Sequence, residues 1–413
     1  MSKRLKILLL TTSVPFPSYN GRELPIEKFF TALSKKHIVD IVITHSTLTA
    51  YELKIKNTPA SIRHIDFLPS RQSNAKKRYV EELLGKSVAF MNYSYKLEDV
   101  KNIFDDREEY DLVWTSPIST LALVEFLNAK GISFYKYLGL GLNDIKSSSY
   151  RNGLRKLLSR RKFSLDLLFS YLRSWIVQKY ERTYLLKADL VHVQTESEKR
   201  KGLNLLKKDP DTFPQFIVIP NGIKKELLEC DYRGVESNKI LFMTHLCGAR
   251  KDESYWFLNN VWPAIRSQTN LRLLLVGTPP CGDNELLLDD RIDVLGYVDD
   301  LRALFNQIKL AVVPIFHNSG LINRIQDLLV ASVPVVTLPE PASTFTGLES
   351  GMHIQVVNSA KEFVDTVIQL DKSKNLRLAL SRNGRNFAVQ MPSWSEASDQ
   401  FINEIEQFIT SDT

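Results

Sequence analysis

Residues 310–338, LAVVPIFHNSGLINRIQDLLVASVPVVTL, contain one complete unit of a parallel β-sheet. The apolar run at 310–314 is followed by a loop of small and polar residues, by a stretch with helical spacing, and by a second apolar run at 333–338. Short runs rich in Val, Ile and Leu that alternate with helical segments are typical of strands buried on both faces of a parallel sheet. This stretch therefore predicts the α/β class.

The same alternation continues in both directions and divides into two series of strands. The first series is expected at residues 5–10, 40–44, 111–115, 134–138, 190–193 and 216–219. The second series is expected at residues 240–244, 271–277, 293–295, 310–314, 333–338 and 354–357. Two such series predict two Rossmann-like, doubly wound parallel sheets.

The turn Pro220-Asn221-Gly222 and the polar stretch that follows it mark the boundary between the two sheets. The predicted organisation is an N-terminal domain over 1–222, a linker over 223–238, a second domain over 239–392, and a C-terminal helix over 393–413 that crosses back to the first domain. Ligands of doubly wound sheets bind at the carboxyl ends of the strands. The cleft between the domains is therefore the expected site.

The composition suits a globular chain of this size. The 413 residues suffice for two domains, and 44% hydrophobic with 24% charged residues argues against a disordered or fibrous protein. No run reaches the roughly 18 uncharged apolar residues of a membrane-spanning helix, and Lys6 interrupts the apolar run at the start, which argues against a signal peptide. The three cysteines are too widely spaced for a zinc site or a disulfide framework, so we expect a cytoplasmic location.

In each series, the first strand is followed by a loop that contains small and cationic residues. Gly21 and Arg22 lie between the first strand and the first helix, where a glycine lets backbone N–H groups approach an anion, although an ordinary turn would look the same. Arg250 and Lys251 follow the strand at 240–244 and are suited to neutralising a diphosphate, although a solvated pair at a helix start is the simpler alternative.

The stretch at 310–338 carries a second group of candidates. Ser319 and Gly320 leave the backbone open at the start of a helix, and Asp327, two turns along, can accept hydrogen bonds from a ribose diol. Arg324 lies on the same helical face, where an ordinary surface ion pair is the alternative interpretation. His245 and His317 also follow predicted strands. None of the seven histidines has metal-ligand spacing, so no metal site is predicted.

Together these stretches resemble the family 4 type of retaining glycosyltransferase with the GT-B fold, in its branch of bacterial exopolysaccharide and capsule sugar transferases. The similar stretches are TTSVPFPSYNG, KYERTYLLKADLVHVQTESEKR, VIPNGI, WFLNNVWPAI, LRLLLVG, VLGYVDDLRALFNQIKLAVVPI, GLINRIQDLLVASVPVVT and TGLESGMHI. The resemblance covers nearly the whole chain. It implies a nucleotide-sugar donor held by the second domain, a glycan or polyprenyl-linked acceptor held by the first, and no cofactor or metal.

The resemblance also implies roles for individual residues. Asp327 stands where the family has the glutamate that holds the nucleotide ribose, and Asn143-Asp144 matches the loop near the acceptor. The expected catalytic positions are Asn143, Asp144 and His245. The expected donor-binding positions are Gly21, Arg22, Arg250, Lys251, His317, Ser319, Gly320, Leu321, Arg324 and Asp327.

The chain departs from the family pattern at three of these places. Asp327 is shorter than glutamate, Ser319 occupies the first position of the family's Glu-x7-Glu pattern, and Thr244 or His245 stands where a glycine is expected. A noncatalytic subunit that binds an acceptor or a partner transferase is therefore the alternative function. A dehydrogenase is disfavoured because the Gly-x-Gly-x-x-Gly fingerprint is absent.

The net charge of +7 is a local feature. Residues 151–208 contain fifteen Lys and Arg against five Asp and Glu, a charge of +10 that leaves −3 for the rest of the chain. This basic stretch includes a predicted amphipathic helix along 165–179 and no nucleic-acid-binding module, so it favours an anionic surface on the inner face of the cytoplasmic membrane, with a solvated basic face as the alternative. The cations expected at that surface are Arg155, Lys156, Arg160, Arg161 and Lys162.

Overall fold

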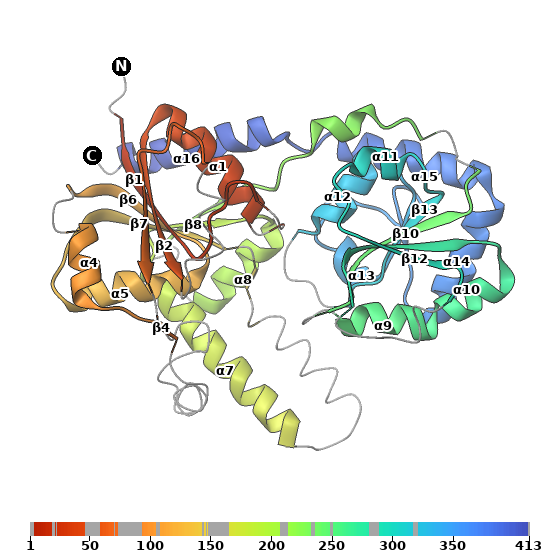
Figure 1. The fold of residues 1–413 in the computed structure, drawn as a ribbon, viewed down its shortest axis with the longest axis horizontal. Helices are drawn as coiled ribbons and strands as arrows, with labels where there is room; N and C mark the ends of the chain where they lie inside the picture. The colour runs from red at the N-terminus through yellow and green to blue at the C-terminus, as the bar shows by residue number, and fades with distance from the viewer. Residues whose placement is uncertain are drawn as a thin grey trace. The chain divides into compact units, whose positions relative to one another are not determined.

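The structure is a computed structural model (Figure 1). It describes residues 4–18, 21, 23–45, 58–69, 71–72, 93–104, 108–142, 144–145, 147, 165–206, 214–232, 236–247, 251–280, 289–316 and 321–411. The chain forms two compact units. The N-terminal unit comprises Met1–Pro220 together with Ser395–Thr413, and the C-terminal unit comprises Asn221–Trp394.

The N-terminal unit is built on a parallel sheet with the strand order β3-β2-β1-β6-β7-β8-β9. Its strands are β1 (Lys6–Thr11), β2 (Ile38–His45), β3 (His64–Pro69), β6 (Tyr110–Thr115), β7 (Tyr135–Gly141), β8 (Leu190–Val193) and β9 (Gln215–Val218). A short antiparallel pair, β4 (Arg71–Gln72) and β5 (Tyr93–Ser94), lies apart from it. All six strands expected from the sequence are present, and the edge strand β3 is an addition to them.

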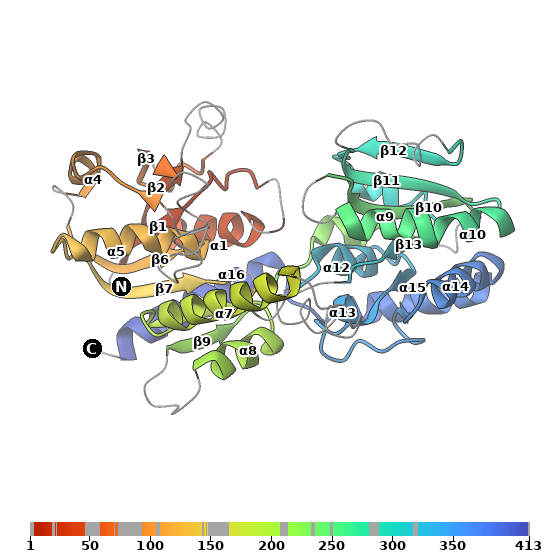
Figure 2. The same cartoon turned by 90° about the horizontal axis from the view of Figure 1, so that it is seen from below.

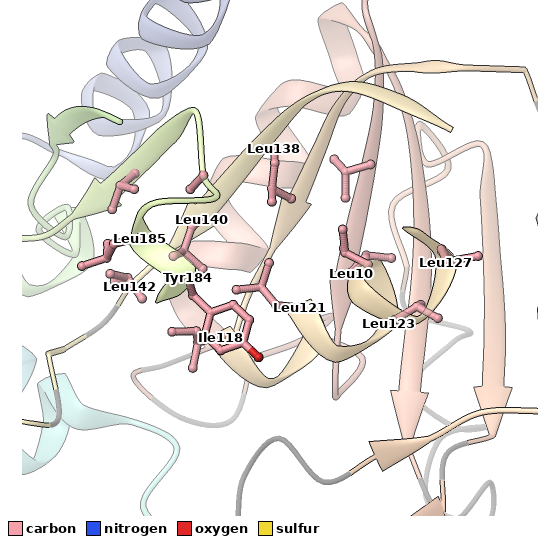
Figure 3. Close-up of a cluster of buried hydrophobic side chains, with 14 of the residues drawn as sticks. Leu10, Ile118, Leu121, Leu123, Leu127, Leu138, Leu140, Leu142, Tyr184 and Leu185 are labelled. Carbon is pink, nitrogen blue, oxygen red and sulfur yellow. The ribbon is translucent and has the colours of Figure 1, made fainter. Parts of the chain in front are cut away.

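Helices cover both faces of this sheet. They are α1 (Glu23–Lys36), α4 (Leu97–Phe104), α5 (Leu121–Ala129), α7 (Leu165–Leu185), α8 (Glu196–Leu206) and α16 (Trp394–Ser411), with the 3₁₀ turn η1 (Ile118–Thr120). Helix α7 packs beside α8 (Figure 2). On one face, apolar side chains of the strands meet those of η1, α5 and α7, among them Leu10, Leu140, Leu121 and Tyr184 (Figure 3). Burial of each such side chain contributes about 1.5–3 kcal/mol to folding.

The C-terminal helix α16 covers the other face of the same sheet. Phe401 of α16 stacks on Phe29 of α1 with ring centroids 4.5 Å apart and meets the edge of Trp114 at 4.9 Å. Gly139 allows Trp114 to lie flat against β7, because a Cβ on Gly139 would be 2.3 Å from the indole ring. The expected return of the C-terminal helix to the first domain is therefore confirmed.

The C-terminal unit is built on a second parallel sheet with the order β12-β11-β10-β13-β14-β15. Its strands are β10 (Lys239–His245), β11 (Arg272–Thr278), β12 (Ile292–Gly296), β13 (Leu310–Val313), β14 (Val335–Thr337) and β15 (Gln355–Val356). Its helices are η3 (Lys225–Glu229), α9 (Lys251–Asn260), α10 (Trp262–Gln268), α11 (Leu301–Phe305), α12 (Asn323–Val330), α13 (Pro339–Ala342), α14 (Ala360–Lys372) and α15 (Lys374–Ala388). The prediction of two Rossmann-like parallel sheets is confirmed.

The segment that enters this unit is packed onto it. The N–H of Ile223 donates to the carbonyl of Pro392 at 2.9 Å, and the Tyr232 hydroxyl donates to the carbonyl of Lys309 at 2.5 Å. Arg385 of α15 donates to the carbonyls of Leu228 and Cys230. Much of the stretch expected as a linker is thus part of the C-terminal unit. Among the described helices, none is long and apolar enough to cross a membrane.

Candidate functional site

The carboxyl ends of β10 and β11 are joined by close backbone and side-chain contacts. Gly277 has φ +126°, and a Cβ there would be 2.2 Å from the carbonyl oxygen of Thr244, so this register requires glycine. His245 is exposed at the end of β10, and its Nδ1 lies 2.7 Å from the Thr278 hydroxyl. The Ser254 hydroxyl donates to the His245 carbonyl at 2.9 Å and also bonds the Thr244 hydroxyl. These contacts place His245 at the carboxyl edge of the second sheet.

Lys251 is the first residue of α9, directly after this edge. Its side chain is exposed, and the helix begins with it, so its charge lies at the positive end of the helix dipole. Glu253 in the same turn accepts a hydrogen bond from the N–H of Phe316 at 3.2 Å. The start of α9 is thereby tied to the loop that follows β13.

Helix α12 begins on that loop and brings Arg324 and Asp327 to the same edge. Arg324 donates a hydrogen bond to the carbonyl of Met243 in β10. The Asp327 residue is 7% exposed, and its Oδ2 accepts a hydrogen bond from Lys224 Nζ at 2.9 Å. Burial raises the pKa of the Asp327 carboxyl, and the positive charge of Lys224 opposes that shift. Lys224 is therefore the counter-charge of the Asp327 carboxylate in this structure.

The residues before Lys224 are also bound to α12. The side-chain amide of Asn221 donates to Asn323 Oδ1 at 2.6 Å, and the carbonyl of Asn221 accepts from Gln326 Nε2 at 2.9 Å. The sequence predicts only a turn at Pro220-Asn221-Gly222, so it misses Lys224 as a partner of Asp327. The signal available was the cation two residues after that turn.

Tyr297 is a further residue that the sequence does not single out. It follows Gly296, which has φ +67°, at the carboxyl end of β12, and the residue is 73% exposed. An aromatic ring this exposed presents an apolar face to solvent at the edge where a ligand of the sheet would bind.

In the N-terminal unit, Gly21 and Asp144 follow the carboxyl ends of β1 and β7. Gly21 is exposed just before α1, and Asp144 is half-buried. Two buried carboxylates fix the loop around Asp144. Glu198 of α8 accepts from the N–H of Ile145 at 2.9 Å, and Glu181 of α7 accepts from the N–H of Ser147 at 3.1 Å.

Burial raises the pKa of Glu198, and the positive charge of Lys201 opposes that shift. The sequence gives no signal for Glu181 and Glu198, because polar positions in amphipathic helices are ordinarily on the solvent face. Their burial shows that the loop after β7 is held by α7 and α8.

The structure brings Lys251, Leu321, Arg324 and Asp327 to the carboxyl edge of the second sheet, together with His245. Several predicted positions lie outside the described residues. They are Arg22, Asn143, Arg250, His317, Ser319, Gly320 and the cations Arg155, Lys156, Arg160, Arg161 and Lys162. Within the described ranges, no group of three or more His, Cys, Asp or Glu side chains could hold a metal ion.

Comparison with known proteins agrees with this architecture. Residues 237–372 match the family model described as glycosyl transferases group 1. No curated protein matches the chain by sequence. Among solved structures, HepE of Anabaena in complex with UDP is 14% identical with a TM-score of 0.66, covering 98% of this chain and 100% of that one.

Two further structures are similar over nearly the same length. Sucrose-phosphate synthase from Thermosynechococcus elongatus is 15% identical with a TM-score of 0.69, covering 98% of this chain and 100% of that one. WaaG, a glycosyltransferase involved in lipopolysaccharide biosynthesis, is 13% identical with a TM-score of 0.58, covering 95% and 98%. The resemblance to GT-B glycosyltransferases is confirmed: residues 237–372 match the group 1 glycosyl transferases, within a chain that has the two-sheet fold of the solved enzymes.

Proposed function

We propose that this chain is a retaining glycosyltransferase of the family 4 type. It transfers a sugar from a nucleotide-sugar donor to a glycan or polyprenyl-linked acceptor in bacterial surface or exopolysaccharide biosynthesis, without a metal or cofactor. The observation that carries the proposal is the gathering of Lys251, Arg324 and Asp327 at one sheet edge, within the residues that match the group 1 family model.

The chemistry of these side chains fits a nucleoside diphosphate. The carboxylate of Asp327 can accept hydrogen bonds from both hydroxyls of a ribose, and Lys251 at the start of α9 can neutralise a diphosphate. HepE was solved with UDP and with UDP-glucose, which makes the uridine nucleotides the first donors to test.

With retention, the bond between the sugar C1 and the diphosphate oxygen breaks, and the acceptor oxygen bonds to C1 on the same face. The acceptor proton passes to the departing diphosphate oxygen, so no dedicated protein base is needed. What the protein supplies is positioning and stabilisation of the charge on the diphosphate. In this scheme we assign Asp144 of the N-terminal unit to acceptor binding and His245 of the C-terminal unit to the transferred sugar.

The test is an assay of the purified chain with UDP-, GDP- and ADP-sugars and a bacterial lipid extract. Sugar transfer is expected with one donor class, with an unchanged rate after chelation of metals and with retained anomeric configuration by NMR. Asp327→Ala is expected to abolish transfer. Asp365→Ala, at an exposed position on α14, is the matched control and keeps full activity. Absence of both donor hydrolysis and transfer for every donor would count against the proposal.

A second candidate is a noncatalytic subunit that binds an acceptor or a partner transferase. It is favoured by the absence of the expected glycine, since Thr244 or His245 stands at that place, and Thr244 is buried and bonded to Ser254. Nucleotide binding separates the two functions. Loss of UDP binding in Asp327→Ala and Lys251→Ala contradicts the second candidate, whereas a chain that binds no nucleotide supports it.

We also propose that the N-terminal unit contacts an anionic membrane surface from the cytoplasmic side. Tyr171 and Trp175 of α7 are 55% and 54% exposed, and Lys179 lies 5.8 Å from the Trp175 ring centroid. Exposed aromatic rings beside cations suit a lipid interface. WaaG acts in lipopolysaccharide biosynthesis, a comparable surface-glycan setting.

Vesicle flotation tests this attachment. Binding is expected to increase with anionic lipid, to decrease with salt, and to weaken in Trp175→Ala. The matched control is Tyr297→Ala, an exposed aromatic residue of the C-terminal unit. If vesicle binding depends on neither the anionic lipid content nor the salt concentration, the proposed attachment is contradicted. The basic stretch that includes α7 is then a solvated surface.

A further inference from the structure

Asp327 is a nearly buried carboxylate whose charge is balanced from outside its own helix. The Asp327 side chain is 9% exposed, and Lys224, with a side chain 27% exposed, places Nζ 2.9 Å from Oδ2. Among the charged groups that face Asp327, Lys224 favours the ionised form and Glu226 disfavours it, while Arg324 of the same helix donates to Met243. A carboxyl group at this depth without a cation would take up a proton.

The position of Lys224 is set by backbone contacts on both sides. The carbonyl of Asn221 accepts from Gln326, which directly precedes Asp327, and the N–H of Ile223 donates to Pro392. Gly222 lies between them, where a Cβ would be 2.3 Å from the backbone nitrogen of Trp394. Lys224 is therefore held against α12 by the packing of its segment rather than by the ion pair alone.

A carboxylate binds a ribose diol well only when it is ionised, because it then accepts hydrogen bonds at both oxygens. We propose that Lys224 is a positioning residue of the donor site, which keeps Asp327 ionised and oriented for the ribose diol of a nucleoside diphosphate. The inference rests on the proposed function, since it assumes that Asp327 binds the donor. Lys224 acts through Asp327 and need not touch the donor itself.

The test is titration of the full chain with UDP, GDP and ADP by calorimetry from about pH 5 to pH 9, a range that spans one to several units above the usual carboxyl pKa. Lys224→Gln removes the charge but keeps a hydrogen-bond donor. Lys224→Arg keeps the charge. Lys225→Gln changes an exposed lysine next in the chain and is the matched control.

For whichever of the three nucleotides binds, the unaltered chain and Lys225→Gln are expected to show the same dependence of the dissociation constant on pH. In Lys224→Gln, binding is expected to weaken as pH falls, with a midpoint about one pH unit or more higher, a shift that approaches a tenfold loss or more at pH values below both midpoints. Lys224→Arg is expected to restore the original profile. A purely structural role of Lys224 would weaken binding equally at every pH.

Equal weakening at every pH, or an unchanged profile in Lys224→Gln, overturns the inference. Loss of binding in Asp327→Ala then still supports the proposed function. If the unaltered chain binds none of the three nucleotides, the proposed function fails and the inference fails with it. If Lys224→Gln does not fold, the same comparison is made with Lys224→Met, in which the profile is expected to shift in the same direction.

Discussion

His37 Nε2 lies 3.0 Å from Glu406 Oε1, so the residue that follows α1 contacts the last helix of the chain. Its Nδ1 accepts a hydrogen bond from the N–H of Leu5 at 3.4 Å, just before β1. Burial lowers the pKa of His37, although Glu406 opposes the shift. The first strand, the first helix and α16 therefore meet at an imidazole that the fold favours in its neutral form.

His192 is a second buried imidazole in the same unit. Its Nε2 lies 2.9 Å from the carbonyl of Ile219, its ring meets those of Phe29 and Phe401, and burial lowers its pKa to about 4. Because the folded-state pKa lies below the unfolded value, the unfolded chain binds more protons between them. The stability that neutral His192 contributes is therefore fully present above about pH 6.5 and is lost as the pH falls toward 4.

We expect the free energy of unfolding to fall by about 3 kcal/mol from His192 alone over that interval, with a further loss from His37. Urea unfolding at a series of pH values measures this slope. His192→Gln is expected to flatten it, whereas His64→Gln, at an exposed position in β3, leaves it unchanged. An identical slope in His192→Gln would show that other groups cause the acid sensitivity.

Two glycines at carboxyl strand ends are expected to differ in their tolerance of alanine. Gly277→Ala places a Cβ 2.2 Å from the carbonyl of Thr244 at φ +126°, so it should destabilise the chain by about 3 kcal/mol or more. At Gly296, φ is +67° and nothing lies within 4 Å of the added Cβ, so Gly296→Ala should lose only about 1–2 kcal/mol. Thermal unfolding of the pair checks this ranking, and equal losses would contradict it.

Ser332 lies two residues after α12 with φ +63°, and its Oγ accepts a hydrogen bond from Arg385 at 3.2 Å. Ser332→Gly removes the backbone strain, worth about 1 kcal/mol, and loses a hydrogen bond of similar value, so its stability should stay within about 1 kcal/mol of the original. Ser332→Val keeps the strain with a β-branched side chain and should cost about 2 kcal/mol or more. Chemical denaturation of both variants gives the comparison, which fails if valine is tolerated as well as glycine.

Lys251 is expected to act through charge. Lys251→Gln should weaken binding of a nucleoside diphosphate about tenfold and reduce the salt dependence of that binding, because an exposed cation interacts through screened electrostatics. Lys361→Gln, an exposed lysine on α14, should change neither quantity. Calorimetric titration at low and high salt measures both, and an unchanged salt dependence in Lys251→Gln would exclude a direct charge contact.

The sequence predicted the strands well because each is a local apolar run. It missed β3, whose residues HIDFLP mix charged and apolar side chains because an edge strand is only half-buried. It placed Arg324 and Asp327 on one helix because their spacing is helical. Both lie on α12, as that spacing predicts.

Contacts between distant segments were decided only by the tertiary structure. Lys224 and Asp327 are far apart in the sequence, and nothing in the turn before Lys224 specifies which carboxylate it will face. Glu181 and Glu198 look like solvent-facing positions of their helices. In the structure they are buried and accept hydrogen bonds from backbone N–H groups after β7. The sequence by itself determined the two parallel sheets, because hydrophobic periodicity is local. The partners of the buried charges depended on packing, because a buried charge is stabilised by whichever opposite charge or N–H group the fold brings next to it.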